Sequence, residues 1–563
     1  MCYNHIAKFN YAEGGFMKNS IRKFVSLLMT AVLIMSSFVV ISSASNAAPA
    51  SAERATTIPT VYIQGYGADI YADANNRNSE VLVGGGVPFL TDGVLGGLIE
   101  NIMEPLMKGV TTGDYTEYND LVAETLIADL GRFGLDENGE PSDGSGNFCV
   151  RDSGYADRRW YSGKFDIYAY SLTYDWRVDL FVTAAELNAY IKNVKAATGC
   201  SKVNLMGRCL GANVVLAYLS EYGTDDINAI NFYVGGLDGF EIVGALFSGE
   251  IVVDSDALDR FLPMTIDSEE DELISFAKSF VSILNFINGL DLPIDVVYGI
   301  YEQVYTNILP RVLKESFGSM PAFWSFVGEE YYESAKALNF PTAEEQEKYA
   351  GLIEKIDRYY NEVTLKTEDI INNAVAEGVK IYFTSKYGFP AVPLSKEAVL
   401  YSDSTVSVTS QTFGATVTEM GENFSRDYLK NAEKNGTLIF ISPDRCVDAS
   451  TAILPEHTWF IKGSKHENMP NSIDIMQAKI FEKTYLENKY VTVLDFEEYP
   501  QYLVVESDDE YAPLLAMTED NSDVLDGWNV SVFTNLSNFL EKLLDFISSL
   551  VNQIRSLIAN TEI

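Results

Sequence analysis

The sequence predicts an α/β fold: a mostly parallel sheet with helices on both faces and a helical insertion. Three observations predict it. Short β-rich runs alternate with helical stretches up to about residue 240, a pattern typical of parallel strands joined by crossover helices. The alternation stops over residues 240–375 and resumes at Val379. A glycine-flanked turn at residues 207–211 joins a buried strand directly to a helix.

Composition excludes several classes of protein. The 563 residues carry 40 Lys and Arg against 80 Asp and Glu, a net charge of −40, while 47% are hydrophobic. An intrinsically disordered acidic chain would lack that apolar content. Nucleic acid is not expected as a partner, because phosphate binding needs clustered basic residues. The five Cys are too few for a disulfide scaffold.

Residues 1–52 have the layout of a secretory signal peptide. From Met17, a basic stretch precedes an apolar run over residues 24–41 and a tail of small residues. An uncleaved membrane anchor is the alternative, since the apolar run is just long enough to span a bilayer. We therefore expect a secreted or cell-surface protein.

The mature chain then divides into elements that support the α/β prediction. Strands are expected at residues 60–64, 165–170, 202–206 and 230–234, with helices at 95–130, 183–197 and 212–222. Residues 240–375 are mostly helical and predict a cap over the carboxyl edge of the sheet. Further strands are expected at 379–384 and 458–461. The expected domains are a core in two parts (53–239 and 376–517), the cap between them, and a linker with a C-terminal amphipathic helix (518–563).

The C-terminal helix has a continuous apolar stripe between residues 533 and 558. Packing against the rest of the chain is its simplest role. Self-association or attachment to a surface is the alternative.

The turn Gly207-Arg208-Cys209-Leu210-Gly211 carries the chemistry. A Gly-x-nucleophile-x-Gly turn between strand and helix exposes its central side chain in a strained conformation. The helix N-terminus offers backbone N–H groups to a developing oxyanion. The residues therefore point to Cys209 as the nucleophile, and an ordinary buried Cys is the competing interpretation.

A nucleophilic thiol needs a base, and the chain has three His. His5 lies in the leader, and His457 precedes the strand at 458–461, the last strand expected. His466 follows that strand at the carboxyl edge and is the preferred base.

The orienting acid is expected after the strand at 379–384. Asp403 is preferred, because Val406 can pack beneath its loop; Asp444 and Asp448 compete, since both lie closer in sequence to His466. The chain order nucleophile, acid, base is that of the α/β hydrolases. The backbone N–H groups of Tyr66 and Leu210 are the expected oxyanion donors.

These residues resemble the α/β-hydrolase superfamily and, within it, lecithin–cholesterol acyltransferase-like lipases. The resemblance covers roughly residues 58–245 and 376–485. It lies in Gln64-Gly-Tyr-Gly67, Tyr174-Asp-Trp-Arg177, the box around Cys209, Asp403-Ser-Thr-Val406 (Asp-Gly-Thr-Val in the family) and His466-x-x-Met469. Cys replaces the family's Ser, and an extra segment at about 410–457 separates acid from base. The resemblance implies lipid or carboxylic-ester substrates.

The expected function is an exported acyl-ester hydrolase acting through a Cys acyl-enzyme, with Cys209, His466 and Asp403 as the catalytic residues. An acyltransferase on the same fold, or an inactive hydrolase-fold binding protein, are the alternatives. No cofactor or metal is expected. The aromatic segment 320–327 in the cap is interpreted either as a lid for an apolar substrate or as ordinary helical core.

Overall fold

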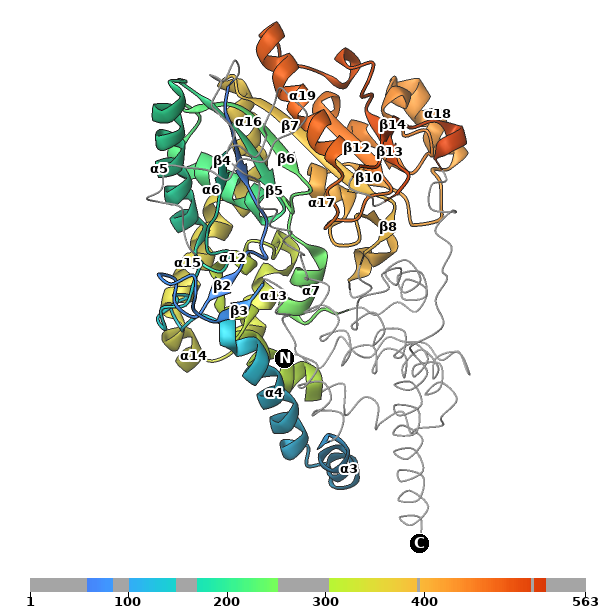
Figure 1. Ribbon diagram of the computed structural model, residues 1–563. Coiled ribbons are helices and arrows are strands. Elements are labelled where there is room, and N and C mark those ends of the chain that lie inside the picture. Colours follow the sequence, from blue (N-terminus) through green and yellow to red (C-terminus); the bar gives the residue numbers. More distant parts are fainter. Residues whose placement is uncertain are drawn as a thin grey trace.

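The computed structural model describes residues 58–84, 101–147, 170–251, 303–391, 395–507 and 511–522. Its centre is an eight-stranded sheet in the order β14-β13-β12-β7-β6-β5-β1-β4 (Figure 1). Neighbouring strands run parallel except for β13 and β14. The strands are β1 (Thr60–Ile63), β4 (Tyr170–Leu172), β5 (Val203–Arg208), β6 (Ile227–Tyr233), β7 (Lys380–Tyr387), β12 (Thr458–Lys462), β13 (Tyr502–Val505) and β14 (Leu514–Ala516).

The strand order reverses direction once. From β1 the chain first goes outward to β4, then returns to β5 on the other side of β1 and proceeds away through β6, β7, β12 and β13. Ligands of such sheets bind beyond the carboxyl ends of the strands at the point of reversal. That point lies between β1 and β5, which end at the Gln64–Gly67 turn and at Cys209. This is the α/β-hydrolase fold.

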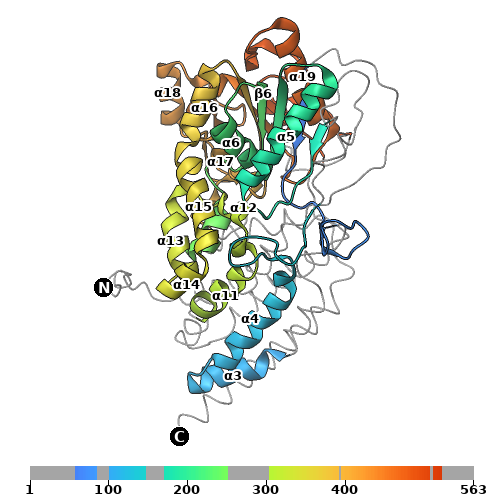
Figure 2. The ribbon, with the colours of Figure 1, turned by 90° about the vertical axis from the view of Figure 1, so that its left-hand side faces the viewer.

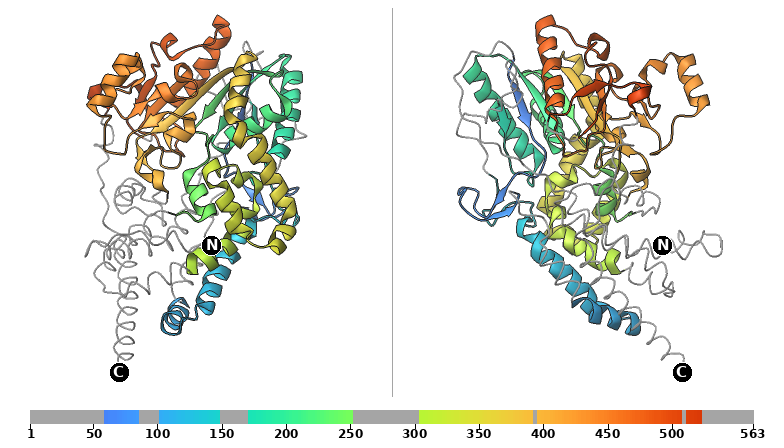
Figure 3. Two further views of the ribbon diagram at one scale, coloured as in Figure 1. Left: turned by 180° about the vertical axis from the view of Figure 1, so that it is seen from behind. Right: turned by 45° about the vertical axis from the view of Figure 1, so that its right-hand side comes forward.

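Helices cover both faces of the sheet (Figures 1 and 3). Because side chains alternate along a strand, Val61 and Leu205 pack in the core shared with α5 (Leu180–Thr198), α6 (Leu210–Tyr222) and α16 (Thr367–Ala376). Tyr62 and Met206 pack on the opposite face with α19 (Asn471–Glu487). The parallel strands are therefore buried on both sides, as their near-continuous apolar sequences require.

The described residues between β6 and β7 are mostly helical, and the helices α11 (Leu309–Lys314), α13 (Glu329–Asn339) and α14 (Ala343–Lys348) among them lie beyond the carboxyl ends of the strands (Figure 2). We refer to this part of the chain as the cap. Its last helix, α16, already packs against α6 and β7 of the core. The other described elements before it are α7 (Glu241–Ser248), the π-helix η2 (Val304–Ile308), η3 (Phe317–Ser319), α12 (Pro321–Trp324), α15 (Ala350–Glu362) and η4 (Thr364–Lys366).

The cap has a second component that the sequence did not indicate. The helix α4 (Thr116–Leu130) packs on η2 and α11, and α3 (Met103–Thr112) packs on α4. The short helix η1 (Gly131–Phe133) follows α4 and contacts β3 (Val81–Val83). Asn119 Nδ2 donates to Gln303 Oε1 (2.8 Å), and Arg311 pairs with Asp120 (2.8 Å). Two segments far apart in the chain thus build one helical layer.

Residues 389–457 form a small lobe beside β7 and β12, and most of it is the extra segment between acid and base. Its core contains Tyr401, Val408 and Val447. The lobe contains β8 (Phe389–Pro390), η5 (Lys396–Val399), β9 (Tyr401–Ser402), α17 (Val408–Thr412), β10 (Thr416–Val417), α18 (Arg426–Asn435), η6 (Leu438–Phe440), β11 (Val447–Asp448), η7 (Ala449–Thr451) and η8 (Pro455–His457). Elsewhere lie β2 (Ile70–Tyr71), β3 (Val81–Val83), η9 (Val493–Asp495) and η10 (Glu519–Asn521).

One expectation about the strands was wrong. The strand at 458–461 is not the last of the sheet, because β13 and β14 follow α19 and extend the edge. Their apolar runs of four and three residues are too short for periodicity to reveal.

Three predictions fall on other parts of the chain. The leader (1–52), most of the expected strand at 165–170 and the C-terminal amphipathic stretch lie outside the described residues. Within the described ranges, no helix combines the length and apolar character needed to cross a membrane.

Candidate active site

Cys209 occupies a strained turn between β5 and α6. Its φ of 52° and ψ of −124° lie outside the ordinary regions for an L-residue. A Cβ on Gly211 would lie 2.1 Å from the carbonyl oxygen of Ile63, and one on Gly207 would lie 2.8 Å from that of Gly211. Gly211 is therefore needed for α6 to approach the end of β1, and Gly207 for α6 to start so close to β5, as the spacing predicts for a nucleophile turn.

The loop after β1 lies directly against Cys209. A Cβ on Gly65 would lie 2.8 Å from the Cβ of Cys209 and 3.3 Å from its Sγ. Tyr66, the next residue, is buried, and Leu210 is the first residue of α6. Of the two residues expected to supply oxyanion donors, one thus follows Cys209 in the chain and the other follows the glycine packed against it.

The Tyr-Asp-Trp-Arg stretch holds this loop in place. Tyr174 Oη donates to the carbonyl of Gln64, and Trp176 Nε1 to that of Ala68, both at 2.8 Å. Arg177 forms a bidentate pair with Asp175 (2.9 and 2.7 Å) and is wholly buried. The motif therefore has a physical role: it fixes the backbone that faces the thiol.

His466 is joined to Asp403 and not to the competing acids. Its Nδ1 donates to Asp403 Oδ2 at 2.6 Å. The other oxygen, Oδ1, accepts the backbone N–H groups of Thr405 and Val406 (3.0 and 2.8 Å). The Asp-Ser-Thr-Val turn thus uses one carboxylate oxygen to fold itself and presents the other to the histidine.

The second ring nitrogen of His466, Nε2, is the one that is not bound to Asp403. Nε2 is buried and makes no hydrogen bond of regular geometry among the described residues. Burial opposes a charge on the imidazole, but the Asp403 carboxylate and the Cys209 sulfur, each as a charge and as a hydrogen-bond partner, raise the pKa of His466 to about 9. The ring is therefore poised to carry a proton between the thiol and a leaving group.

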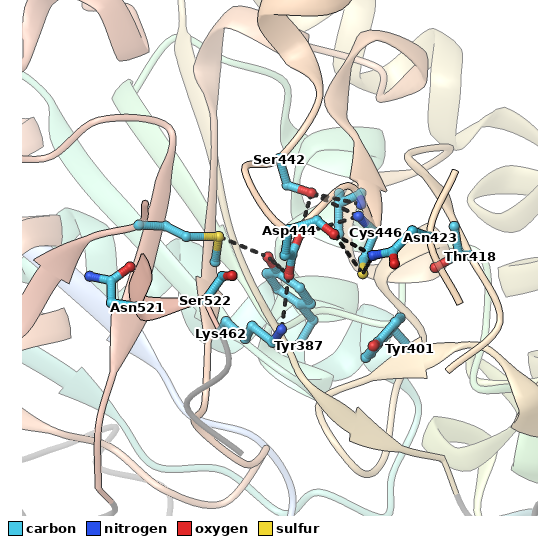
Figure 4. A network of polar contacts seen from close by, with 12 residues as sticks. Tyr387, Tyr401, Thr418, Asn423, Ser442, Asp444, Cys446, Lys462, Asn521 and Ser522 are labelled. Atoms are coloured by element: carbon cyan, nitrogen blue, oxygen red, sulfur yellow. Dashed lines mark hydrogen bonds and ion pairs between the residues drawn. The ribbon is translucent and has the colours of Figure 1, made fainter. Parts of the chain in front are cut away.

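Asp444 and Asp448 have other partners. Asp444, in the lobe beside β7 and β12, lies between Tyr387 Oη and Lys462 Nζ, each at 3.0 Å (Figure 4). A polar cavity of about 480 Å³ adjoins this pair. Asp448 accepts the hydroxyl of Tyr428 (2.8 Å) and caps η7. Proximity in sequence to His466 was therefore misleading.

His457 is also remote from the thiol. Its Nδ1 hydrogen-bonds the carbonyl of Val491 (2.8 Å), and its ring stacks on Tyr490 with 3.5 Å between centroids. Burial lowers the pKa of His457. It packs at the opposite end of β12 from His466.

Aromatic side chains of the cap cover the site. Phe326 stacks on Phe240 with 3.9 Å between centroids, and Phe240 meets the His466 ring edge-on at 6.2 Å. Asn213, one turn after Cys209, donates to the backbone and hydroxyl of Ser325, both at 3.1 Å. Segment 320–327 is thus packed as buried core beside the site, and Cys209 is only 3% exposed.

Two basic residues near His466 were missed by sequence reasoning. Arg208 Nη2 donates to the carbonyls of His466 and Glu467 (2.8 and 3.4 Å), and Lys386 Nζ to those of Lys465 (2.9 Å) and Asn468. A basic residue at the end of a strand resembles an ordinary surface charge in sequence, so only the buried ends of β5 and β7 reveal them. Within the described ranges, no cluster of three or more His, Cys, Asp or Glu could hold a metal ion.

Comparisons with known proteins add little to this geometry. No family model matches the chain, and no curated protein does. Among solved structures, an esterase from a Rhodococcus species is 11% identical over 50% of this chain and 78% of its own, with a TM-score of 0.14. A prohormone-processing carboxypeptidase from Saccharomyces cerevisiae is 9% identical over 82% and 86%, with a TM-score of 0.25. Likenesses this weak carry no chemical argument, and the fold assignment rests on the strand order.

Proposed function

We propose that this chain is an acyl-ester hydrolase in which Cys209 forms the acyl-enzyme. The observation that carries the proposal is the hydrogen bond of 2.6 Å between His466 and Asp403 at the edge where the strained Cys209 turn lies. A histidine oriented by a carboxylate beside a nucleophile is the arrangement that acyl transfer requires. A buried Cys with only a packing role would need neither partner.

The reaction follows from the positions of these groups. The thiol proton passes first to His466 Nε2, whose raised pKa favours this transfer. Sγ of Cys209 then attacks the ester carbonyl as the thiolate, and the N–H groups of Tyr66 and Leu210 bind the oxyanion. The carbon–oxygen bond breaks, His466 gives its proton to the departing alcohol, and a thioester remains. Water, losing a proton to His466, then attacks the thioester and releases the carboxylic acid and the free thiol.

The walls of the site favour apolar acyl groups. Tyr66, Trp176 and Phe323 form one edge-packed cluster, and Phe326, which packs on Phe323 at 5.8 Å between centroids, links this cluster to Phe240 beside His466. Such a surface gains binding energy from hydrocarbon and offers few partners to polar chains. The resemblance to lecithin–cholesterol acyltransferase-like lipases at Tyr174–Arg177 supports the same class of lipid or carboxylic esters.

Transfer of the acyl group to an alcohol is the second candidate, favoured by the burial of Cys209 beneath the cap. A site that excludes water lengthens the life of a thioester and lets another acceptor react.

We also propose that the protein acts outside the cell, on the basis of the leader in residues 1–52. Amino-terminal sequencing of exported protein tests that location.

Turnover of p-nitrophenyl esters of graded chain length tests the proposed function. We expect turnover to rise with chain length, an acyl-enzyme adduct on Cys209 in mass spectra, and loss of both in Cys209→Ala and after iodoacetamide. Addition of a long-chain alcohol separates transfer from hydrolysis by its ester product. Cys446→Ala is the matched control, because that buried thiol lies in the lobe and contacts Asp444. Full activity in Cys209→Ala, or no turnover of any ester together with no alkylation of Cys209, overturns the proposal.

A further inference from the structure

The loop that carries His466 is held by two basic side chains from other strands. Residues 465–468, here called the His466 loop, direct four successive carbonyl oxygens at these cations. Arg208 binds the carbonyls of His466 and Glu467, and Lys386 binds those of Lys465 and Asn468. Both cations are buried, Lys386 completely.

We propose that Arg208 and Lys386 are positioning residues that hold the His466 loop across the sheet so that its imidazole stays on Cys209. This inference rests on the proposed function, which it extends to the residues that place the base. In this proposal neither Arg208 nor Lys386 contacts a reacting atom.

The strand order explains why the loop needs such support. His466 follows β12, whereas Cys209 follows β5, and β7 and β6 lie between them. Three strand spacings amount to about 14 Å, which the loop must cover over the strand ends. Lys386 comes from β7, near the start of that path, and Arg208 is the last residue of β5, at its end. The two contacts therefore fix the loop at both ends of its crossing.

Chemistry makes these contacts stiff. Hydrogen bonds from a charged donor to a carbonyl are shorter and stronger than neutral ones, and the buried carbonyl of His466 would be costly to leave without a donor. The Lys386 ammonium also lies 5.2 Å from the centre of the Tyr233 ring, at the end of β6. A loop held in this way has little freedom to carry His466 away from the thiol, and a displacement of about 1 Å can cost about 100-fold in rate.

The direction in which the pKa of His466 changes distinguishes a positioning role of Arg208 and Lys386 from a purely electrostatic one. The groups that raise the pKa of His466 are Asp403 on the neighbouring loop and Cys209 at the turn. Removing a nearby positive charge would by itself raise the pKa of His466 further. Loosening the loop weakens the contact with Asp403 and lowers that pKa toward its ordinary value. A fall is therefore the signature of lost positioning.

The test uses Arg208→Met and Lys386→Met in the full chain. We expect kcat on the best p-nitrophenyl ester to fall about 10- to 100-fold with little change in KM. The pKa of His466, followed by NMR of protein labelled at its three histidines, should fall from about 9 toward 6.5. Arg208→Lys, which keeps the charge and one donor, should recover part of both.

Lys462→Met is the matched control, because Lys462 is an equally buried lysine at the same sheet edge whose ammonium binds Asp444 instead. It should lower thermal stability yet leave kcat and the His466 titration unchanged. If either Met variant fails to fold, Arg208→Lys and Lys386→Gln are judged by the same readouts.

Native kcat with an unchanged or raised pKa of His466 in folded variants overturns the inference. An equal loss of kcat in the Lys462→Met control overturns it as well. The NMR titration needs no substrate, so a native chain that turns over no ester refutes the proposed function while the positioning of His466 is still decided.

Discussion

Asp403 binds His466 at two points. Its carbonyl oxygen accepts the backbone N–H of His466 at 2.7 Å, and its Oδ2 accepts Nδ1–H of the ring at 2.6 Å. Asp403 therefore fixes both the backbone position of His466 and the rotation of its imidazole. A residue that bound only the ring would leave the histidine free to move with its loop.

Asp403→Asn should separate these two contacts. The carbonyl of residue 403 still accepts the backbone N–H of His466. The side-chain oxygen of Asn is needed by the N–H groups of Thr405 and Val406, so its NH₂ group faces Nδ1, which must then accept a hydrogen bond instead of donating one. We expect kcat to fall about 10³- to 10⁴-fold through the wrong tautomer, with only a small change in unfolding temperature. The matched variants Asp444→Asn and Asp448→Asn should show the reverse, because those carboxylates bind Lys462 and Tyr428 in the lobe. Steady-state kinetics and thermal unfolding of the three variants check this, and a large loss of kcat in Asp448→Asn would contradict the assignment.

Stability should fall with rising pH across the titration of His466. The native pKa of about 9 exceeds the ordinary 6.5, so the folded state binds the extra proton. Its contribution is fully present below pH 6.5 and is lost as pH rises through about 9, with a slope of up to about 1.4 kcal/mol per pH unit. Urea unfolding of the native chain and of His466→Gln between pH 6 and 9.5 measures the difference. Parallel curves for the two proteins would refute the raised pKa.

Much of the site could be predicted because its chemistry depends on local sequence. The glycines two residues before and after Cys209 are required because a Cβ there would lie 2.8 and 2.1 Å from a backbone oxygen. The turn can therefore be recognised from the sequence. With three histidines and one of them in the leader, His466 followed nearly by elimination. Asp403 was preferred because Val406 could pack beneath its loop. Val406 is fully buried in the core, and its backbone N–H also binds the Asp403 carboxylate.

The rest depends on contacts between distant segments. Nothing in residues 103–133 indicates that they join the cap, because an amphipathic helix does not name its partner. Arg208 and Lys386 resemble any other charged residues until the strand order brings the His466 loop over them. The aromatic segment 320–327 could not be assigned to core or lid from sequence, because both need apolar side chains; in the structure it is packed as buried core.

Replacement of Ser404 with glycine should stabilise the folded protein. Its φ of 83° lies in the left-handed region, which costs an L-residue about 1–2 kcal/mol. Glycine also increases the entropy of the unfolded chain, at a cost of about 0.4–1 kcal/mol. We therefore expect Ser404→Gly to gain about 0.5–1 kcal/mol with activity unchanged. Thermal unfolding measures it, and Thr405→Gly, at a residue without positive φ, should be destabilising; equal losses in both variants would argue against strain at Ser404.

Gly65→Ala should impair the chemistry more than the fold. The added methyl would lie 2.8 Å from the Cβ of Cys209 and 3.3 Å from its Sγ, so the loop must withdraw from the thiol. We expect at least a 100-fold loss of kcat, comparable to the loss of one oxyanion donor. Gly131→Ala is the control, because its φ of −69° suits any residue and its added methyl would make only ordinary contacts, 3.4 Å from Glu315 O and 3.5 Å from Ile127 Cγ2. Native kcat in Gly65→Ala would mean that this loop takes no part in the reaction.

Phe326→Ala should open the cover over Cys209. The Phe326 ring is fully buried against Phe240, which in turn contacts His466, so its removal costs about 3–5 kcal/mol of stability and leaves a gap above the thiol. We expect faster alkylation of Cys209 by iodoacetamide and a higher KM for long acyl chains, which lose their apolar wall. Phe460→Ala is the control, since that ring is equally buried but stacks on Tyr502 in the lobe core. It should lose similar stability without faster alkylation, because only a cavity above the thiol shortens the path of the reagent. Equal acceleration in both variants would instead mean that general loosening of the chain, and not the aromatic cover, controls access to Cys209.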